Sequence, residues 1–357
     1  WVISWLLLTA AYVVSAMVSA TPGVVIPWAM LYTMCENYGY KKHDKYPTLM
    51  VIGITLASLM GNAIFPFEAL AMMVQNSLQA QTGQTIDFWR FTILSGALTY
   101  GVVLTYLFAC RFIFRPDVSR IRENDYVYSG ETGLDRRQKL VMGLLALLLF
   151  LLFVPEALPE SIPGVALVNR IGRPGVCALM LAAAGLLPGG DGAGRTDLAR
   201  TMRDGIPWPT MLLLAFALVM TSSITNEATG IQPFLESIFG PVFGSAPNPL
   251  LFIFAVCAVQ LVLTNIFANM VIALLLVPLV SVYAPMAGVS TEMMAVCICV
   301  LTNVSLVLPS ASPFAALLHG NSEWVTSREI YKYSSVAVVL VAVASTVICA
   351  TLGSALF

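Results

Sequence analysis

The chain has 357 residues, of which 58% are hydrophobic and 10% are charged; its formal net charge is −1 and its mean hydropathy is +0.85. A soluble domain averages about 45–50% apolar and about 25% charged residues, so this chain has too few charges to cover a soluble globule of its size. Composition therefore predicts an all-α polytopic protein of the cell membrane (inner or plasma membrane). It excludes a nucleic-acid partner, because no basic cluster lies beside an interleaved aromatic array.

Apolar runs along the chain predict the membrane crossings. A helix needs about 20 mainly apolar residues to cross roughly 30 Å of hydrocarbon. Runs near that length occur at 47–75, 91–114, 139–154, 172–188, 208–225, 291–318 and 334–357. Two further runs, 1–38 and 248–284, are too long for one crossing and carry small or polar residues near the middle. We interpret both as re-entrant hairpins of two half-length helices, because non-helical backbone at membrane depth must line protein or a wet cavity.

The distribution of basic residues supports this topology. If both ends of the first hairpin lie inside the cell, the inner loops hold 15 of the 18 basic residues, and the outer side keeps only Arg90, Arg170 and Arg173. The positive-inside rule expects such a skew. The long charged stretch 115–138 is then a cytoplasmic loop or interfacial helix, with a gate or docking element as the alternative.

Each predicted hairpin is followed by an interrupted span. The first interruption is LMGNAIFPFE at 59–68, and the second is NVSLVLPSASPF at 303–314. Thr21 and Pro66 are 45 positions apart, and Asn265 and Pro309 are 44 apart. On the topology above, the first hairpin enters from inside and the second from outside. The two units are therefore predicted to form an inverted repeat with two broken transmembrane helices.

Paired interrupted helices are a sequence signal for the central site of a transporter. Breaking a helix exposes N–H groups, which attract anions, and C=O groups, which coordinate a cation such as Na+. Hydroxyl and carboxamide side chains complete such a site without a fixed charge, which is costly at the midplane. Candidates at the four interruptions are Ser19, Thr21, Asn62, Thr264, Asn265, Ser310 and Ser312. Local bonding to helix carbonyls, or contact between helices, is the alternative; it applies most to Asn303 and to Asn269, which is expected on the same helical face as Asn265.

Glu68 follows the first interruption and has two interpretations. It is either a proton-coupling carboxyl within the membrane or a carboxylate stabilised by the dipole at the start of a half-helix. Glu227 and His319 are expected near the membrane interfaces. No HExxH, no GxSxG and no paired intramembrane aspartates occur, so an embedded enzyme is not predicted.

Several segments together resemble the divalent anion:sodium symporter family, the Na+-coupled di- and tricarboxylate carriers of the ion transporter superfamily. They are RRQKLVMGLLALLLF at 136–150, RDGIPWPTMLLLAFALVM at 203–220, LTNIFANMVIALLLVP at 263–278 and LPSASPFAALLHGN at 308–321. Thr264-Asn265-Ile266 stands where the family has Ser-Asn-Thr at a hairpin tip, and 309–313 stands at its proline-containing break. The first half departs from the pattern, because Ala20 replaces the tip asparagine.

We predict a transport core of residues 1–90 and 248–333, scaffold helices in 91–247 and a C-terminal transmembrane helix at 334–357. The resemblance implies a homodimer, embedded in lipid, whose core moves between the two membrane faces in an elevator mechanism. It also implies several helices before the first hairpin, so an N-terminal part is expected to be missing.

The predicted substrate is a small organic dianion such as succinate, malate, fumarate or citrate. Expected substrate-binding residues are Ser19, Thr21, Thr264, Asn265 and Ser312. The expected coupling ion is Na+, with no other metal; its candidate ligands are Thr264, Asn265, Pro309 and Ser310 at one site and Ser19, Gly61 and Asn62 at a second. The alternatives are a proton-coupled or exchange-type anion carrier of the same superfamily, in which Glu68 takes part, and an uncoupled anion channel.

Overall fold

The computed structural model describes residues 1–123, 136–157, 163–186, 203, 229–244, 248–267 and 269–357. Every regular element in these residues is a helix, as the composition predicted. The chain divides into two compact units, Trp1–Tyr126 with Leu214–Phe357, and Val127–Leu213. The predicted crossing at 208–225, Glu227 and residues 124–135 of the charged stretch 115–138 lie outside the described residues.

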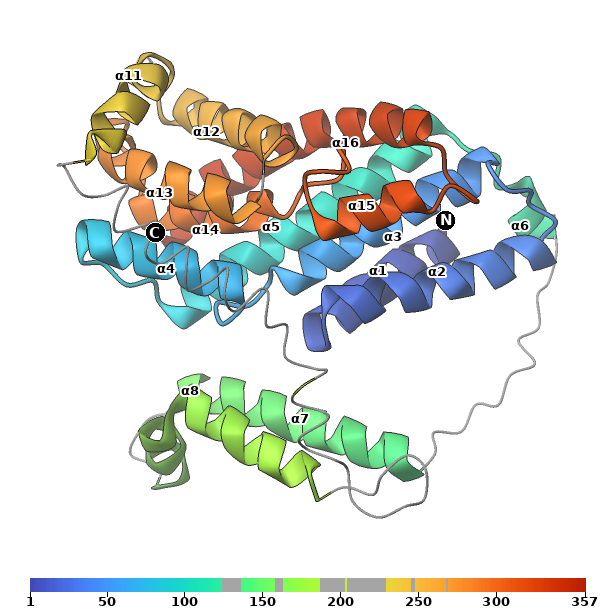
Figure 1. Ribbon diagram of the computed structural model, residues 1–357, viewed down its shortest axis with the longest axis horizontal. Coiled ribbons are helices and arrows are strands. Elements are labelled where there is room, and N and C mark those ends of the chain that lie inside the picture. The colour runs from blue at the N-terminus through green and yellow to red at the C-terminus, as the bar shows by residue number, and fades with distance from the viewer. Residues whose placement is uncertain (124–135, 158–162, 187–202, 204–228, 245–247, 268) are drawn as a thin grey trace. The chain divides into compact units, whose positions relative to one another are not determined.

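The first part of the chain begins with a helix pair, α1 (Val2–Met17) and α2 (Ala20–Asn37), followed by a helix broken at 63–68 into α3 (Lys45–Asn62) and α4 (Ala69–Thr82). Then come α5 (Phe88–Phe108), a π-helical continuation η1 (Ala109–Phe114) and α6 (Ser119–Glu123). Helices α1, α2 and α3 lie side by side (Figure 1). Two glycines allow this close approach, since a Cβ added at Gly61 would lie 2.1 Å from the Tyr12 carbonyl oxygen and one at Gly23 would lie 2.7 Å from the Ser15 Cβ.

The last part of the chain repeats the pattern of a helix pair followed by a broken helix. Its helices are α11 (Ile231–Phe243), α12 (Pro249–Thr264), α13 (Asn269–Met286), α14 (Thr291–Thr302), α15 (Pro313–Gly320), α16 (Ser327–Ile348), the π-helical η3 (Cys349–Gly353) and α17 (Ser354–Leu356). Because α12 ends at Thr264 and α13 begins at Asn269, the prediction that Asn265 and Asn269 share one helical face was wrong.

The second compact unit contains α7 (Arg136–Ala157) and α8 (Pro163–Ala184), which pack against each other. Helix α8 turns by 96° between Gly164–Gly172 and Gly175–Ala184, and Gly172 adopts a positive φ of 72° at the turn. The crossing predicted at 172–188 therefore begins at a bend inside a longer helical segment. Only glycine adopts this backbone conformation readily.

Four helix interruptions fall in the regions where the sequence predicted them. In chain order they lie at Val18-Ser19, 63–68, 265–268 and 303–312. The first tip is shorter than expected, because Thr21, Pro22 and Gly23 already belong to α2. Proline is tolerated in the first turn of a helix, where its missing N–H needs no partner.

Three helices of the described residues are long and apolar enough to cross a membrane: Phe88–Phe114, Asn269–Met286 and Ser327–Leu356; there are four if the bent pair in α8 counts as one span. Helices α1, α12 and α14 are apolar but shorter, with 16, 16 and 12 residues. These lengths fit a polytopic membrane protein.

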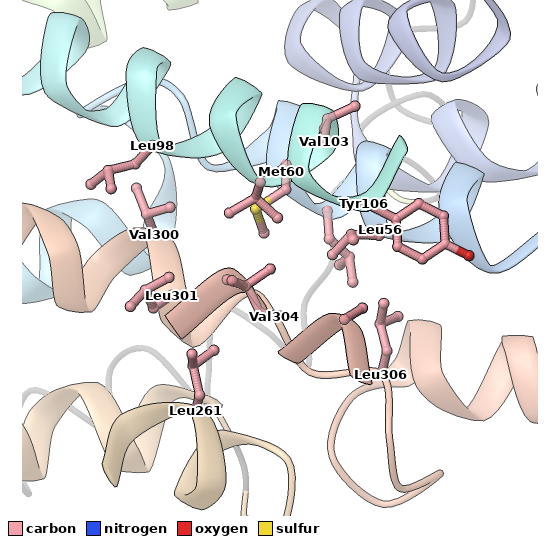
Figure 2. Packing of buried hydrophobic residues seen from close by; sticks show 14 of the residues in the cluster. Leu56, Met60, Leu98, Val103, Tyr106, Leu261, Val300, Leu301, Val304 and Leu306 are labelled. Carbon is pink, nitrogen blue, oxygen red and sulfur yellow. The ribbon is translucent and has the colours of Figure 1, made fainter. Parts of the chain in front are cut away.

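The apolar side chains of the second interruption belong to the main core. Figure 2 shows Val304 and Leu306 in the same cluster as Leu56 of α3 and Tyr106 of α5. All four side chains are buried. The interruption at 303–312 is thus packed on one side against helices from the first part of the chain.

A second contact joins the two parts of the chain near the end of α2. The Tyr32 ring stacks on Trp324 with centroids 4.5 Å apart and an interplanar angle of 9°. The Asn321 Nδ2 donates to the Tyr32 hydroxyl at 2.6 Å, and Lys42 forms an exposed ion pair with Glu323. We call these five residues the clasp.

Candidate functional site

The Asn265 carboxamide ties the tip between α12 and α13 to the backbone of the second interruption. Its Nδ2 donates to the carbonyls of Leu261 and Val304, at 2.8 Å in each case. Its Oδ1 accepts from the N–H groups of Leu306 at 3.0 Å and Val307 at 2.9 Å. A carboxamide has two donors and two lone pairs, so every hydrogen-bonding position of Asn265 is used. In this conformation Asn265 braces the interruption.

The hydroxyl of Thr264 lies beside this brace, at the last residue of α12. Its Oγ1 is 2.7 Å from the Thr302 carbonyl oxygen and 3.0 Å from the Asn269 Oδ1, and its single hydrogen is shared between these two acceptors. The Asn269 Nδ2 in turn donates to the Ser305 Oγ at 3.0 Å. Asn269 therefore hydrogen-bonds across the tip from the start of α13 and also contacts the interruption. From the sequence, this role could not be distinguished from simple contact between helices.

Gln260 and Thr302 extend the polar contacts into the α12–α14 interface. The Gln260 Nε2 donates to the Ile298 carbonyl at 2.5 Å and to the Thr302 Oγ1 at 2.8 Å. The buried Oε1 of Gln260 has no hydrogen-bond partner in the described structure. A fully buried carbonyl-type oxygen without a donor is unusual.

Ser312 links the interruption to the start of α15. Its Oγ donates to the Ser305 carbonyl at 2.9 Å and accepts from the Ala315 N–H at 3.0 Å, so Ser312 caps the helix. Pro309 and Ser310 are exposed on the same stretch. The tip–break assembly is the name used below for Gln260, Thr264, Asn265, Asn269, Thr302, Ser305 and Ser312.

The predicted residues of the first half are not joined to this assembly by any hydrogen bond found in the described residues. Ser19 and Thr21 are exposed at the start of α2, and Asn62 is half-buried at the end of α3. Gly61 has a packing role, because its Cα lies against the backbone of α1. The assignment of these four residues to substrate or cation binding stays a prediction.

Glu68 caps α4. One carboxylate oxygen accepts from the N–H groups of Leu70 at 2.8 Å and Ala71 at 3.3 Å. These contacts are the ones expected from the second interpretation, since a carboxylate at a helix start is stabilised by the N–H groups and the dipole; a part of Glu68 in proton coupling stays a prediction. Asp87 caps α5 through the same i+2 and i+3 contacts, to Trp89 and Arg90.

The chemistry of the assembly is that of neutral oxygen and amide groups. No group of three or more His, Cys, Asp or Glu suited to a metal occurs in the part of the chain that the structure describes. Hydroxyl and carbonyl oxygens favour hard cations. A cavity of about 540 Å³ lies at the other ends of α12 and α14, lined by Asn248, Ser290 and Phe357 among others, so it is separate from the assembly.

The fold and this site define an all-helical membrane protein with polar groups gathered at two interrupted helices. A family model of citrate transporters (CitMHS) matches residues 1–301, and the chain therefore belongs to this family. The chain is thus a citrate or carboxylate transporter rather than an enzyme, in the same superfamily as the divalent anion:sodium symporters, as the resemblance indicated. The comparison with curated proteins gave no match. The match ends before the interruption at 303–312.

Proposed function

We propose that the protein is a Na+-coupled secondary carrier of citrate and related di- and tricarboxylates, with its central site at the tip–break assembly. The observation that carries this proposal is the Asn265 brace, which holds the Leu306 and Val307 N–H groups and the Val304 carbonyl. A braced, non-helical segment keeps its remaining backbone and hydroxyl groups in fixed positions, which is what a transporter site made of broken helices requires.

The start of α15 is the proposed contact for a substrate carboxylate. Ser312 caps this helix, and the exposed Pro309 and Ser310 precede it. The N-terminus of a helix favours anions through its N–H groups and its dipole. Each carboxylate of a dianion needs such a partner, and a neutral site avoids the cost of a fixed buried charge.

The proposed Na+ position lies on the other side of the brace. The Thr264 Oγ1 keeps its lone pairs while donating, and the Asn269 Oδ1 accepts only one hydrogen bond among the described contacts. The buried Gln260 Oε1 is a further neutral oxygen in the same α12–α14 interface. The role proposed for Asn265 is to position these oxygens, because its own carboxamide is fully engaged.

The remaining features of the proposal rest on the family resemblance. They are a homodimer and a core, residues 1–90 and 248–333, that moves between the membrane faces as a unit. Packing of Val304 and Leu306 with Leu56 and Tyr106 supports a single moving body, because it joins the second interruption to helices of the first part. The inverted orientation of the two hairpins belongs to the same proposal.

The test is uptake of labelled citrate into liposomes that contain the purified full-length protein. Uptake is compared under an inward Na+ gradient, an inward proton gradient and no gradient, with succinate as a second substrate. Saturable uptake that requires Na+ supports the proposal. Uptake driven by protons alone replaces Na+ coupling with the proton-coupled alternative, and flux that never saturates indicates a channel. Absence of uptake under all three conditions rejects the proposed substrates and coupling.

A further inference from the structure

His319 lies outside the tip–break assembly and contacts the same interruption from the far side. It is half-buried in the last turn of α15. Its Nε2 lies 3.0 Å from the Val307 carbonyl oxygen, and its Nδ1 lies 3.2 Å from the Ser327 Oγ. The sequence alone placed His319 near a membrane interface and predicted no contact with the interruption.

The two partners determine which ring nitrogen carries the hydrogen. A backbone carbonyl only accepts, so the His319 Nε2 must be the donor to Val307. In the neutral ring Nδ1 is then an acceptor, and the Ser327 hydroxyl donates to it. Both nitrogens of His319 are thus used. Ser327 is itself fixed at the start of α16, where Thr326 and Glu329 form a capping box.

Val307 is consequently held from two directions. Its N–H donates to Asn265 Oδ1 at 2.9 Å, and its C=O accepts from His319. The residues that follow it lead directly to the exposed Pro309 and Ser310 and to the Ser312 cap. The backbone conformation at Val307, whose two flanking peptide groups are both hydrogen-bonded, therefore determines where these groups point.

We infer that His319 is a positioning residue for transport. Its Nε2–H holds the Val307 carbonyl while Asn265 holds the Val307 N–H, and the two contacts together align residues 308–312 for substrate. This inference rests on the proposed function, since it assigns the second interruption to the central site. The required chemistry is a single N–H donor at the end of a side chain of this length. A proton carrier would instead have to release that hydrogen while facing a carbonyl oxygen.

The first test compares citrate uptake kinetics of the full-length wild type with His319→Ala and His319→Gln in liposomes. The Gln amide supplies an N–H donor with a reach similar to that of the imidazole Nε2. His319→Ala is expected to raise the KM for citrate about tenfold, or about 1.4 kcal/mol, with Vmax changed less than about twofold. His319→Gln is expected to restore the KM to within about threefold of wild type. The control is His43→Gln at the chain's other histidine, which is exposed.

A second test does not depend on transport. Amide hydrogen exchange of residues 303–312 reports local opening of the interruption, and it is expected to become faster in His319→Ala and to return toward wild type in His319→Gln. The inference is overturned if His319→Ala keeps both the wild-type KM and the wild-type exchange. It is also overturned if His319→Gln behaves like His319→Ala. If wild-type uptake is absent, the proposed function fails, whereas the exchange result still decides whether His319 holds the interruption.

Discussion

Two units of the molecule each combine a helix pair with a broken helix: the first interrupted unit is α1–α4 and the second is α12–α15. Their helix pairs have the same lengths, but different interactions join each pair to its broken helix. Helices α1 and α12 each have 16 residues, and α2 and α13 each have 18. In the first unit, Gly23 and Gly61 bring backbones into direct contact. In the second unit, Asn265 and Asn269 join the tip to the following interruption by hydrogen bonds.

The difference lies in the tips: in the first unit, glycine contacts and the Ser15–Ser58 and Trp28–Val51 hydrogen bonds join the hairpin to α3, whereas in the second unit the carboxamides of the tip itself bind the interruption. At the first interruption, Phe65 and Phe67 stack with centroids 5.2 Å apart, and the Ile64 carbonyl is bound by the Ser95 hydroxyl at 2.5 Å. Backbone contacts through glycine have little tolerance for added volume. Hydrogen bonds can be exchanged for bonds to a ligand, so we expect the first unit to act as a rigid support and the second to carry the binding chemistry.

The largest expected effect on this comparison comes from Asn265→Ala. The substitution removes the partners of the Val304 carbonyl and of the Leu306 and Val307 N–H groups, and buried groups without partners cost about 1–3 kcal/mol each. Citrate uptake in liposomes is expected to fall about tenfold to 100-fold. The control is Asn303→Ala, whose Nδ2 donates to the Cys299 carbonyl of its own helix. Equal losses in both variants would contradict the special role of the brace.

Gly61→Ala tests the glycine contacts of the first unit. The added Cβ would lie 2.1 Å from the Tyr12 carbonyl oxygen, so α1 and α3 must separate. Overpacking of this kind costs about 1–3 kcal/mol or more, and the melting temperature and the yield of folded protein are expected to drop. The control is Gly96→Ala in α5, where a Cβ meets nothing within 4 Å. A normal melting temperature for Gly61→Ala would show that the close contact is not required.

A smaller effect is expected for Glu68→Gln. Gln keeps an acceptor oxygen but loses the negative charge at the start of α4, which costs about 0.3–1 kcal/mol, while Na+-driven uptake is expected to be retained. Asp87→Asn makes the matching change at the cap of α5, where the amide oxygen still accepts but the charge is lost, and should lower the melting temperature by a similar amount. Loss of gradient-driven uptake in Glu68→Gln, with normal uptake in Asp87→Asn, would assign Glu68 to proton coupling. The coupling residue would then lie in the first interrupted unit, contrary to the division of roles expected above.

The smallest effect is expected at the clasp. Lys42 and Glu323 are exposed, with 50% and 65% of their side chains accessible, and exposed ion pairs contribute only about 0–1 kcal/mol. Lys42→Ala should therefore leave the melting temperature within about one or two degrees of the Lys41→Ala control. A larger drop in melting temperature would mean that the Lys42–Glu323 ion pair is needed to join the first and last parts of the chain.

The sequence predicted the interruptions well because proline, glycine and polar residues are conspicuous inside apolar runs. It also identified Thr264, Asn265 and Ser312, which lie at these places. It missed Gln260 and Thr302, whose contact spans 42 positions. Each is a single polar residue on an apolar helix, and only the relative rotation of two packed helices determines that they meet.

Other differences arise at helix ends. Ser19 and Thr21 were predicted at a polar tip, but α2 starts at Ala20 and leaves both residues exposed. A proline at position 22 is compatible both with a loop and with the first turn of a helix. The choice between the two depends on tertiary contacts, here the approach of Gly23 to α1.

The clasp also affects how the protein is made. Asn321 and Tyr32, which it joins, are 289 positions apart. At a synthesis rate of about 5–20 residues per second, α2 waits roughly 15 to 60 s on the ribosome-bound chain before its partner segment exists. During that interval the first hairpin must keep its shape in the membrane through its contacts with α3 and α5, such as the Tyr12–Thr99 hydrogen bond. Glycine-mediated contact suits this task, because it is complete as soon as α3 has been synthesised.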